Sequence, residues 1–370
     1  MNHRLLPILH VMGLLLISFA STYLMPIVAS LVYDDGATQI FIEAMGVCLL
    51  IGIVLWALTR RFKRELQPRD GFLLVTLAWV LMAAIAALPL MLAIPNLSFT
   101  DAFFETISGL TTTGATVLSG IEYLPPAVNI WRHELNWLGG MGIIVLAVAI
   151  LPLLGVGGMQ LYKAETPGPM KDSKLTPRIA STAKALWLVY FGITVACIAA
   201  LKSVGMSWLD AICHSFAALG LGGFSTYDAN VGHFNSPAIE GVLIVFMLLA
   251  GMNFSTHFIA WRGRSLRAYW ADVEVKTFII LIAISVFMCT IYLWRKDTYP
   301  DAWIALRHVG FNLVSIATDC GFSSVDFEKW PIFVPMWMLL LSCFAVGSGS
   351  TGGGIKMIRA LILVKQAGRE

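Results

Sequence analysis

Three glycine-containing segments of the chain carry residue types that suit the binding of a dehydrated cation. They cover 111–116, 220–226 and 317–323, and each combines glycine with threonine or serine. Glycine permits positive φ, which lets successive backbone carbonyls point the same way, and hydroxyl groups add further oxygen ligands. Rings of such oxygens replace the hydration shell of an ion in a selective pore. The chemistry predicted for these segments is therefore cation coordination.

The three segments recur at similar spacing along the chain. Gly114 lies 109 residues before Gly223, which lies 98 residues before Gly321. Each follows an apolar stretch that is too short to cross a bilayer. The predicted repeating unit is a membrane span, a short helix, a glycine turn and a second span. Small residues that serve close helix packing are the alternative explanation.

The short apolar stretches begin near Asp101, Asp210 and Asp301. We expect Asp101 and Asp210 to cap free N–H groups at the start of two helices. The C-terminal end of such a helix carries partial negative charge, which attracts a cation to the turn that follows. Irregular backbone at membrane depth is tolerated only where it lies within protein or lines water. These features together predict an ion pore.

A glycine-rich segment interrupts the last apolar run, with five glycines in eight residues. Each glycine costs about 1 kcal/mol relative to alanine inside a helix. We therefore expect an unwound loop at mid-membrane that gates the conduit below the three turns. Its spacing to Lys356 does not fit a phosphate-binding Walker motif. The predicted gate residues are Gly347, Ser348, Gly349, Ser350, Thr351, Gly352, Gly353 and Gly354.

The composition places these segments in a membrane protein. Of 370 residues, 58% are hydrophobic and 13% are charged, and the mean hydropathy is +0.79. A soluble fold needs a more polar surface, and a disordered chain has far fewer apolar residues. A disulfide scaffold is excluded as well. A nucleic-acid binder is excluded because the basic residues are scattered and the net charge is only +3. The class that remains is a multi-spanning α-helical membrane protein.

The predicted fold is an all-α membrane protein with eight transmembrane helices and three re-entrant pore helices. The spans are expected at 5–32, 37–58, 71–94, 127–154, 183–204, 236–260, 277–294 and 331–363. The predicted organisation is an N-terminal helix pair (1–60) followed by three pore repeats. These repeats cover 61–158, 159–264 and 265–370, and the last has the broken second helix.

The basic residues predict how the chain is oriented in the membrane. Starting with the N-terminus inside, alternation of the spans leaves most lysines and arginines on the inner side, including the group Arg60, Arg61, Lys63, Arg64 and Arg69. Positive charge favours the cytoplasmic side of a membrane. Both termini are therefore expected in the cytoplasm, and most acidic residues fall on the outer side.

With these residues identified, the chain resembles the Trk/Ktr superfamily of potassium transporters, and within it the bacterial TrkH-type uptake subunits. The resemblance covers the whole chain. It rests on six motifs: RDGF at 69–72, TTTGATV at 111–117, GGMGIIVLAVAILP at 139–152, KAETPGP at 163–169, GGFST at 222–226 and GSTGGGIK at 349–356. The family implies a potassium pore in the bacterial inner membrane, built from four non-identical span–pore helix–span repeats with one filter glycine each.

The resemblance implies which residues form the filter. These are Thr111, Thr112, Thr113, Gly114, Gly220, Leu221, Gly222, Gly223, Thr318, Asp319, Cys320 and Gly321. Potassium is expected at Thr112, Thr113, Leu221, Gly222, Asp319 and Cys320. The third filter departs from the family, which commonly has threonine and alanine where this chain has Asp319 and Cys320. Asp319 either tightens cation binding or alters K⁺/Na⁺ discrimination, or it forms a hydrogen bond behind the filter.

The family further implies a homodimer and a cytoplasmic TrkA-like nucleotide-binding regulatory subunit. Potassium is then the transported ion, and a nucleotide acts only through that partner. The observed period puts a fourth filter glycine near residue ~420, beyond Glu370, so a fourth repeat is expected to be absent and the pore incomplete. A truncated, non-conducting fragment is thus one alternative. A cation-coupled secondary transporter is another, although its inverted repeats are not evident. No enzyme motif such as HExxH is present.

Overall fold

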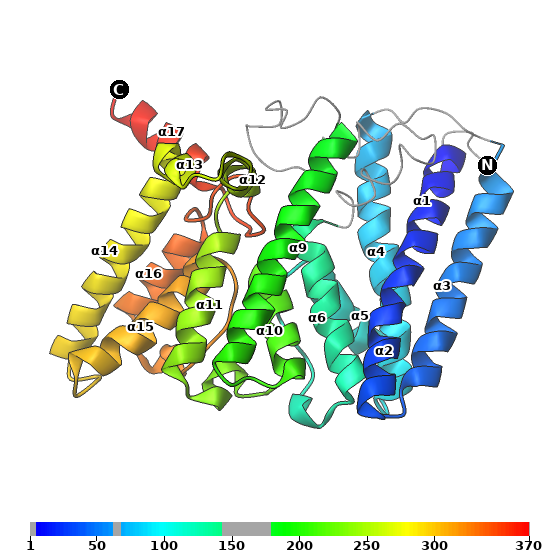
Figure 1. Ribbon diagram of the computed structural model, residues 1–370, viewed down its shortest axis with the longest axis horizontal. Coiled ribbons are helices and arrows are strands. Elements are labelled where there is room, and N and C mark those ends of the chain that lie inside the picture. The colour runs from blue at the N-terminus through cyan, green and yellow to red at the C-terminus, as the bar shows by residue number, and fades with distance from the viewer. Residues whose placement is uncertain (1–4, 62–67, 143–178, 370) are drawn as a thin grey trace. The chain divides into compact units, whose positions relative to one another are not determined.

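The computed structural model describes residues 5–61, 68–142 and 179–369, and within them it contains helices and no strand. Figure 1 shows these helices as ribbons. The chain divides into two compact units. Unit 1 contains Met1–Thr166 and Lys174–Lys184, and unit 2 contains Pro167–Ser173 and Ala185–Glu370. The helical character agrees with the predicted fold class.

Unit 1 is built from a pair of long apolar segments and a second helical group. The first segment, Leu5–Tyr33, is 29 residues long and joins two helices through a short 3-10 turn. The helices of this unit are α1 (Leu5–Ala20), η1 (Ser21–Tyr23), α2 (Leu24–Tyr33), α3 (Thr38–Thr59), α4 (Pro68–Ala93), α5 (Phe99–Leu110), η2 (Ile121–Tyr123) and α6 (Pro126–Met141).

Small residues set the close packing of α1 on α3. A Cβ added at Gly13 would lie 2.8 Å from the carbonyl oxygen of Gly52, and one at Gly52 would lie 2.9 Å from Ile17 Cγ1. Glycines of this kind let helix backbones approach each other within a membrane. Deeper in the unit, the ring centroids of Tyr23 and Trp131 are 4.4 Å apart. The Trp131 indole donates a hydrogen bond to the Ala86 carbonyl (3.0 Å), so its polar N–H is satisfied.

The remaining described helices belong to unit 2, except that the first residues of α9, up to Lys184, belong to unit 1. They are α9 (Ile179–Ser203), α10 (Trp208–Gly220), η4 (Asn230–Phe234), α11 (Pro237–Ala250), α12 (Phe254–Gly263), α13 (Arg267–Ala271), α14 (Val273–Arg295), α15 (Ala302–Ala317), η5 (Phe327–Lys329), α16 (Phe333–Ser342) and α17 (Met357–Ala367). Within unit 2, α10 and α15 are short helices, whereas α14 is long enough to cross a membrane.

Five helical segments in the described residues are long and apolar enough to cross a membrane, or six if one bent pair counts as a span. The five are Leu5–Tyr33, Thr38–Thr59, Asp70–Ala93, Ala183–Ser203 and Val273–Arg295, which lie over five predicted spans. Large apolar side chains such as Leu50, Ile284 and Phe287 are more than half exposed on these helices. Such exposure suits lipid, since water disfavours large apolar surfaces. The chain is therefore a multi-pass membrane protein.

Two predicted spans differ from the structure. The run at 236–260 was expected to be one helix, but α11 and α12 meet at an angle of 96°. The helix ends because Asn253 leaves the helical conformation and its side chain accepts a hydrogen bond from the Ser255 N–H, which caps α12. In the last run, α16 ends at Ser342 rather than near Val346. The predicted span at 127–154 is helical to Met141, and residues 143–154 lie outside the described residues.

Candidate functional site

The helices α5, α10 and α15 begin with well-formed caps. Ser98 and Ser207 are the N-cap residues of α5 and α10, and each side chain accepts a hydrogen bond from the backbone N–H of the aspartate three residues later. The prediction that Asp101 and Asp210 themselves cap these helices is wrong. Both stand in the first turn and accept a hydrogen bond from the cap serine instead (2.7 Å in each case). In α15 the N-cap is Asp301.

The three glycine turns share one backbone conformation. We call them turn A (111–114), turn B (220–223) and turn C (318–321). The closing glycines Gly114, Gly223 and Gly321 have φ of 72°, 65° and 88°. The residues two positions earlier also have positive φ: 55° at Thr112, 54° at Leu221 and 63° at Asp319. The residue between the two in each turn (Thr113, Gly222 or Cys320) does not have positive φ. An alternating φ is the geometry that aligns carbonyls, as the glycine pattern predicted.

The hydrogen bonds at the helix ends repeat in register. In turn A, the Thr112 N–H donates to Gly109 O (3.0 Å) and the Thr113 N–H to Ser108 O (2.9 Å). The same two bonds recur from Leu221 and Gly222, and again from Asp319 and Cys320. No described residue donates a hydrogen bond to the carbonyl oxygens of Thr112, Thr113, Leu221, Gly222, Asp319 and Cys320. These oxygens are therefore available as cation ligands.

Turns B and C lie directly against each other in unit 2. A Cβ added at Gly223 would lie 2.2 Å from the Cys320 carbonyl oxygen and 2.9 Å from the Gly321 carbonyl carbon. Asn230 links the two turns, because its side chain donates to Gly223 O (3.2 Å) and accepts from the Ser323 N–H (3.3 Å). Turn A belongs to unit 1 and is described by itself. The structure thus brings together two of the three predicted filter segments.

One buried polar residue outside the predicted filter stands nine positions before each closing glycine. These residues are Glu105, His214 and Asn312, all buried in the short helices. Each forms a hydrogen bond with the segment that follows its turn: Glu105 with Thr116 (3.0 Å), His214 with Ser225 (3.0 Å) and Asn312 with Ser324 (2.9 Å). We call them the bracing residues. Their common distance from the glycine is a signal that could have identified them.

The brace in unit 1 is a buried ion pair. The Glu105 carboxylate accepts hydrogen bonds from Arg132 Nη2 (2.6 Å) and Nε (2.8 Å) on α6, and both residues are buried. It also accepts from the Thr116 hydroxyl (3.0 Å) and the Val117 N–H (3.2 Å). A buried charge needs such complete pairing, because desolvation is costly. One carboxylate therefore fixes the exit of turn A to two helices.

The Asp319 carboxylate of turn C lies beside the last glycine-rich segment. Its Oδ2 atom is buried, and no described residue donates a hydrogen bond to it. The same atom lies 3.5 Å from the position of a Cβ at Gly353, so the carboxylate faces the last glycine-rich segment. A carboxylate in this place adds negative charge to the lower end of turn C.

The last glycine-rich segment is an irregular loop (343–356) between α16 and α17, as the glycine content predicted. It contacts the ends of two short helices. The Thr351 hydroxyl donates to Leu219 O near the end of α10 (2.8 Å). A Cβ at Gly352 would lie 3.1 Å from Thr318 O at the end of α15. The loop therefore lies against turns B and C.

Several side chains and backbone groups hold this loop. The break between α11 and α12 bonds it through Gly347 N–H to Gly251 O (2.9 Å) and Phe254 N–H to Gly349 O (3.0 Å). The Glu274 carboxylate at the start of α14 accepts from the Ser348 hydroxyl (2.6 Å) and from the Ile358 N–H (2.9 Å). The buried Lys356 ammonium donates to Gly352 O. The loop is thus closed on itself and tied at both ends.

These features define a class: a multi-pass α-helical membrane protein with short helices that end in carbonyl-presenting turns, and with a glycine-rich loop beside turns B and C. Residues 37–370 match the TrkH family model, described as a cation transport protein. The chain belongs to this family. Transport rather than catalysis, as predicted, follows from that membership. Among the described residues, no group of three or more His, Cys, Asp or Glu is suited to hold a metal ion.

Relatives and a solved structure agree with the family assignment. The chain is 51% identical to the Trk system potassium uptake protein TrkH of Salmonella typhimurium, over 98% of this chain and 75% of that protein. It is 40% identical to the Trk system potassium uptake protein TrkG of Escherichia coli, over 98% of this chain and 74% of the relative. The crystal structure of the potassium transporter TrkH from Vibrio parahaemolyticus matches with a TM-score of 0.87 and 43% identity. That match covers all of this chain and 76% of the other.

Proposed function

We propose that the chain takes up potassium as a membrane subunit of a Trk system. The observation that carries this proposal is the backbone geometry common to turns A, B and C, with six carbonyl oxygens that accept no hydrogen bond from the described residues. Oxygens of this kind replace the hydration shell of K⁺ at little cost in a narrow pore. The potassium transport named in the relatives supports the same ion.

We further propose that separate residues form the filter, hold it in position and gate the conduit. Potassium binds the carbonyls of Thr112, Thr113, Leu221, Gly222, Asp319 and Cys320, and the three bracing residues keep these turns in position. The loop at 347–354 acts as the gate, because its contacts with Leu219 O and Thr318 O put it beside the inner ends of turns B and C. The Asp319 carboxylate attracts cations to the space between filter and gate.

The finer architecture is also proposed. Eight spans and three re-entrant helices form an N-terminal pair (1–60) and pore repeats at 61–158, 159–264 and 265–370, with both termini in the cytoplasm of a bacterial inner membrane. Two copies form the dimer, and a TrkA-like nucleotide-binding subunit regulates the gate from the cytoplasm. The Trk system named in the relatives implies partnership with other Trk components.

Ion flux in liposomes tests the proposed activity. We expect a chimera that joins this chain to the part of the Vibrio relative that it does not cover to take up ⁸⁶Rb⁺, with K⁺ competing at least tenfold better than Na⁺. The chain without the added part, in the same assay, tests the alternative of a non-conducting fragment. Absence of ⁸⁶Rb⁺ flux would favour that alternative. Equal competition by Na⁺ would contradict potassium selectivity.

Glu105→Gln tests the bracing role. The substitution leaves the Arg132 guanidinium buried without its counter-charge, which costs about 3–5 kcal/mol. We expect a lower unfolding temperature and weaker discrimination of K⁺ from Na⁺ in the chimera, since Thr116 and Val117 lose the carboxylate that holds them. Adding Arg132→Gln should recover part of the thermal stability but not the selectivity. Glu43→Gln, at an exposed site of α3, is the control. Selectivity at the unsubstituted level in Glu105→Gln would refute a bracing role.

A further inference from the structure

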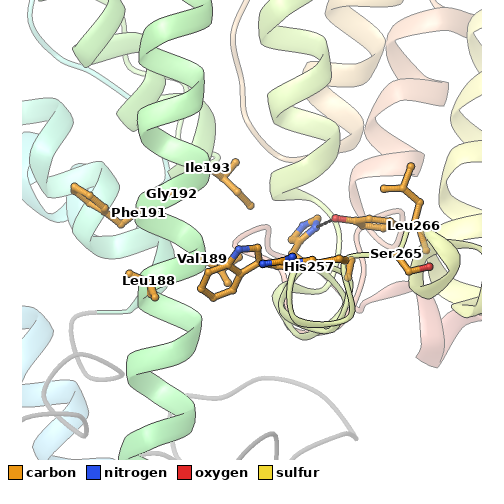
Figure 2. A pocket seen from close by; sticks show the side chains of 12 residues that line it. Leu188, Val189, Phe191, Gly192, Ile193, His257, Ser265 and Leu266 are labelled. Atoms are coloured by element: carbon orange, nitrogen blue, oxygen red, sulfur yellow. Dashed lines mark hydrogen bonds between the residues drawn. The ribbon is translucent and has the colours of Figure 1, made fainter.

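Unit 2 contains a cavity of about 600 Å³ between α9 and the α12–α13 segment. Figure 2 shows Ile193 of α9 directed toward His257 of α12 across it. The walls are mostly apolar, with Leu188, Val189 and Phe191 on the α9 side. Cavities of several hundred Å³ with apolar walls and a few polar groups are typical of small-molecule sites. This cavity belongs neither to the turns nor to the glycine-rich loop.

Aromatic and basic residues mark the level of the cavity in the membrane. Trp261, which lines it, and Trp270 on α13 are 59% and 73% exposed. Arg262, Arg264 and Arg267 are exposed on the same segment. Tryptophan and arginine gather where the hydrocarbon core meets the headgroups. The cavity therefore opens at the depth where phospholipid phosphates and the first parts of acyl chains lie.

Among the described residues, the polar groups near the cavity leave Arg264 without a charged partner. The His257 ring nitrogens are both engaged, with the Tyr269 hydroxyl (2.8 Å) and Leu249 O (2.9 Å). Asp272 on the same segment accepts from the Thr256 hydroxyl (2.7 Å) and caps α14. Arg264 lines the cavity and forms no ion pair with the described residues. The result is an apolar cavity with an uncompensated cation at its rim.

We propose that this cavity binds an anionic phospholipid, with an acyl chain between α9 and α12 and the phosphate at Arg264. A guanidinium matches phosphate oxygens in a two-point hydrogen bond. The acyl chain covers the apolar walls, and removal of its CH₂ groups from water favours binding. A negative headgroup is preferred to a zwitterionic one, because Arg262 and Arg267 add positive potential beside Arg264.

Gly192→Leu is the decisive substitution. Gly192 lines the cavity on α9, and a Cβ there meets no atom within 4 Å, so a larger side chain fills the space without a backbone clash. Gly241→Leu on α11 is the matched control, because a Cβ at Gly241 also meets open space and Gly241 does not line the cavity. Arg264→Gln removes the charge at the rim and keeps the hydrogen-bonding capacity.

Native mass spectrometry of the purified chain with added phosphatidylglycerol, phosphatidylcholine or inorganic phosphate measures the binding. We expect phosphatidylglycerol to bind at least tenfold more tightly than phosphatidylcholine. Gly192→Leu should weaken it at least tenfold, Gly241→Leu should leave it unchanged, and Arg264→Gln should equalise the two lipids. Equal phosphatidylglycerol affinity in both leucine variants would overturn the proposal, as would competition by inorganic phosphate at the same concentration. The measurement needs no ion flux and is independent of the proposed transport function.

Discussion

Alanine at Gly223 is expected to reduce ⁸⁶Rb⁺ flux at least tenfold and to remove the preference for K⁺ over Na⁺. Two independent strains arise at this residue. Its φ of 65° disfavours any side chain, at a cost of roughly 1–2 kcal/mol. The added Cβ would also lie 2.2 Å from the Cys320 carbonyl oxygen, which has to move. Because that oxygen is a proposed potassium ligand, relief of the clash distorts turn C as well as turn B.

The control for Gly223→Ala is Gly241→Ala, where the new Cβ meets open space. Both variants are compared in the chimera for elution as a single species, for unfolding temperature and for flux. The expected pattern is normal assembly with lost selectivity for Gly223→Ala and normal values for Gly241→Ala. A folded Gly223→Ala protein with the original K⁺ preference would remove turn B from the filter.

The membrane spans were largely predictable, and the breaks within them were less so. Hydropathy located the segments at Leu5–Tyr33, Thr38–Thr59 and Val273–Arg295, because a bilayer demands long apolar runs. It missed the break before α12, since Gly251, Met252 and Asn253 interrupt the apolar run only briefly. That break depends on a cap and on tertiary hydrogen bonds from the glycine-rich loop.

The turns show a similar limit. The closing glycines were evident from their spacing, but positive φ at Thr112, Leu221 and Asp319 was not, because such residues seldom adopt it. The bracing residues were missed because the three turns have three different amino acids at this position: glutamate, histidine and asparagine. Their role depends on what lies opposite each helix: an arginine for Glu105 and hydroxyl groups for the other two. Only the assembled structure supplies those partners.

Removal of the Lys356 charge should raise potassium flux. The side chain is 4% exposed, and its ammonium donates to Gly352 O, next to the Gly353 that faces Asp319. In this place, we propose, it closes the loop and opposes the passage of a cation. In the chimera, we expect Lys356→Met to increase ⁸⁶Rb⁺ uptake about fivefold, which corresponds to a shift of about 1 kcal/mol toward the open loop.

Two further variants separate the hydrogen bond from the charge. Lys356→Arg keeps the positive charge beside the loop, so its flux should stay near that of the unsubstituted protein, whereas Glu274→Gln weakens the tie to Ser348 and Ile358 without touching Lys356. If the loop is the gate, Glu274→Gln also raises flux. The control is Lys276→Met, at an exposed position on the same helix as Glu274.

Unchanged flux in Lys356→Met and Glu274→Gln, with both proteins folded, would show that the 343–356 loop does not limit conduction. Higher flux in Lys356→Met alone would instead identify the ammonium as an electrostatic barrier within an already open conduit, since only that variant removes positive charge from the path.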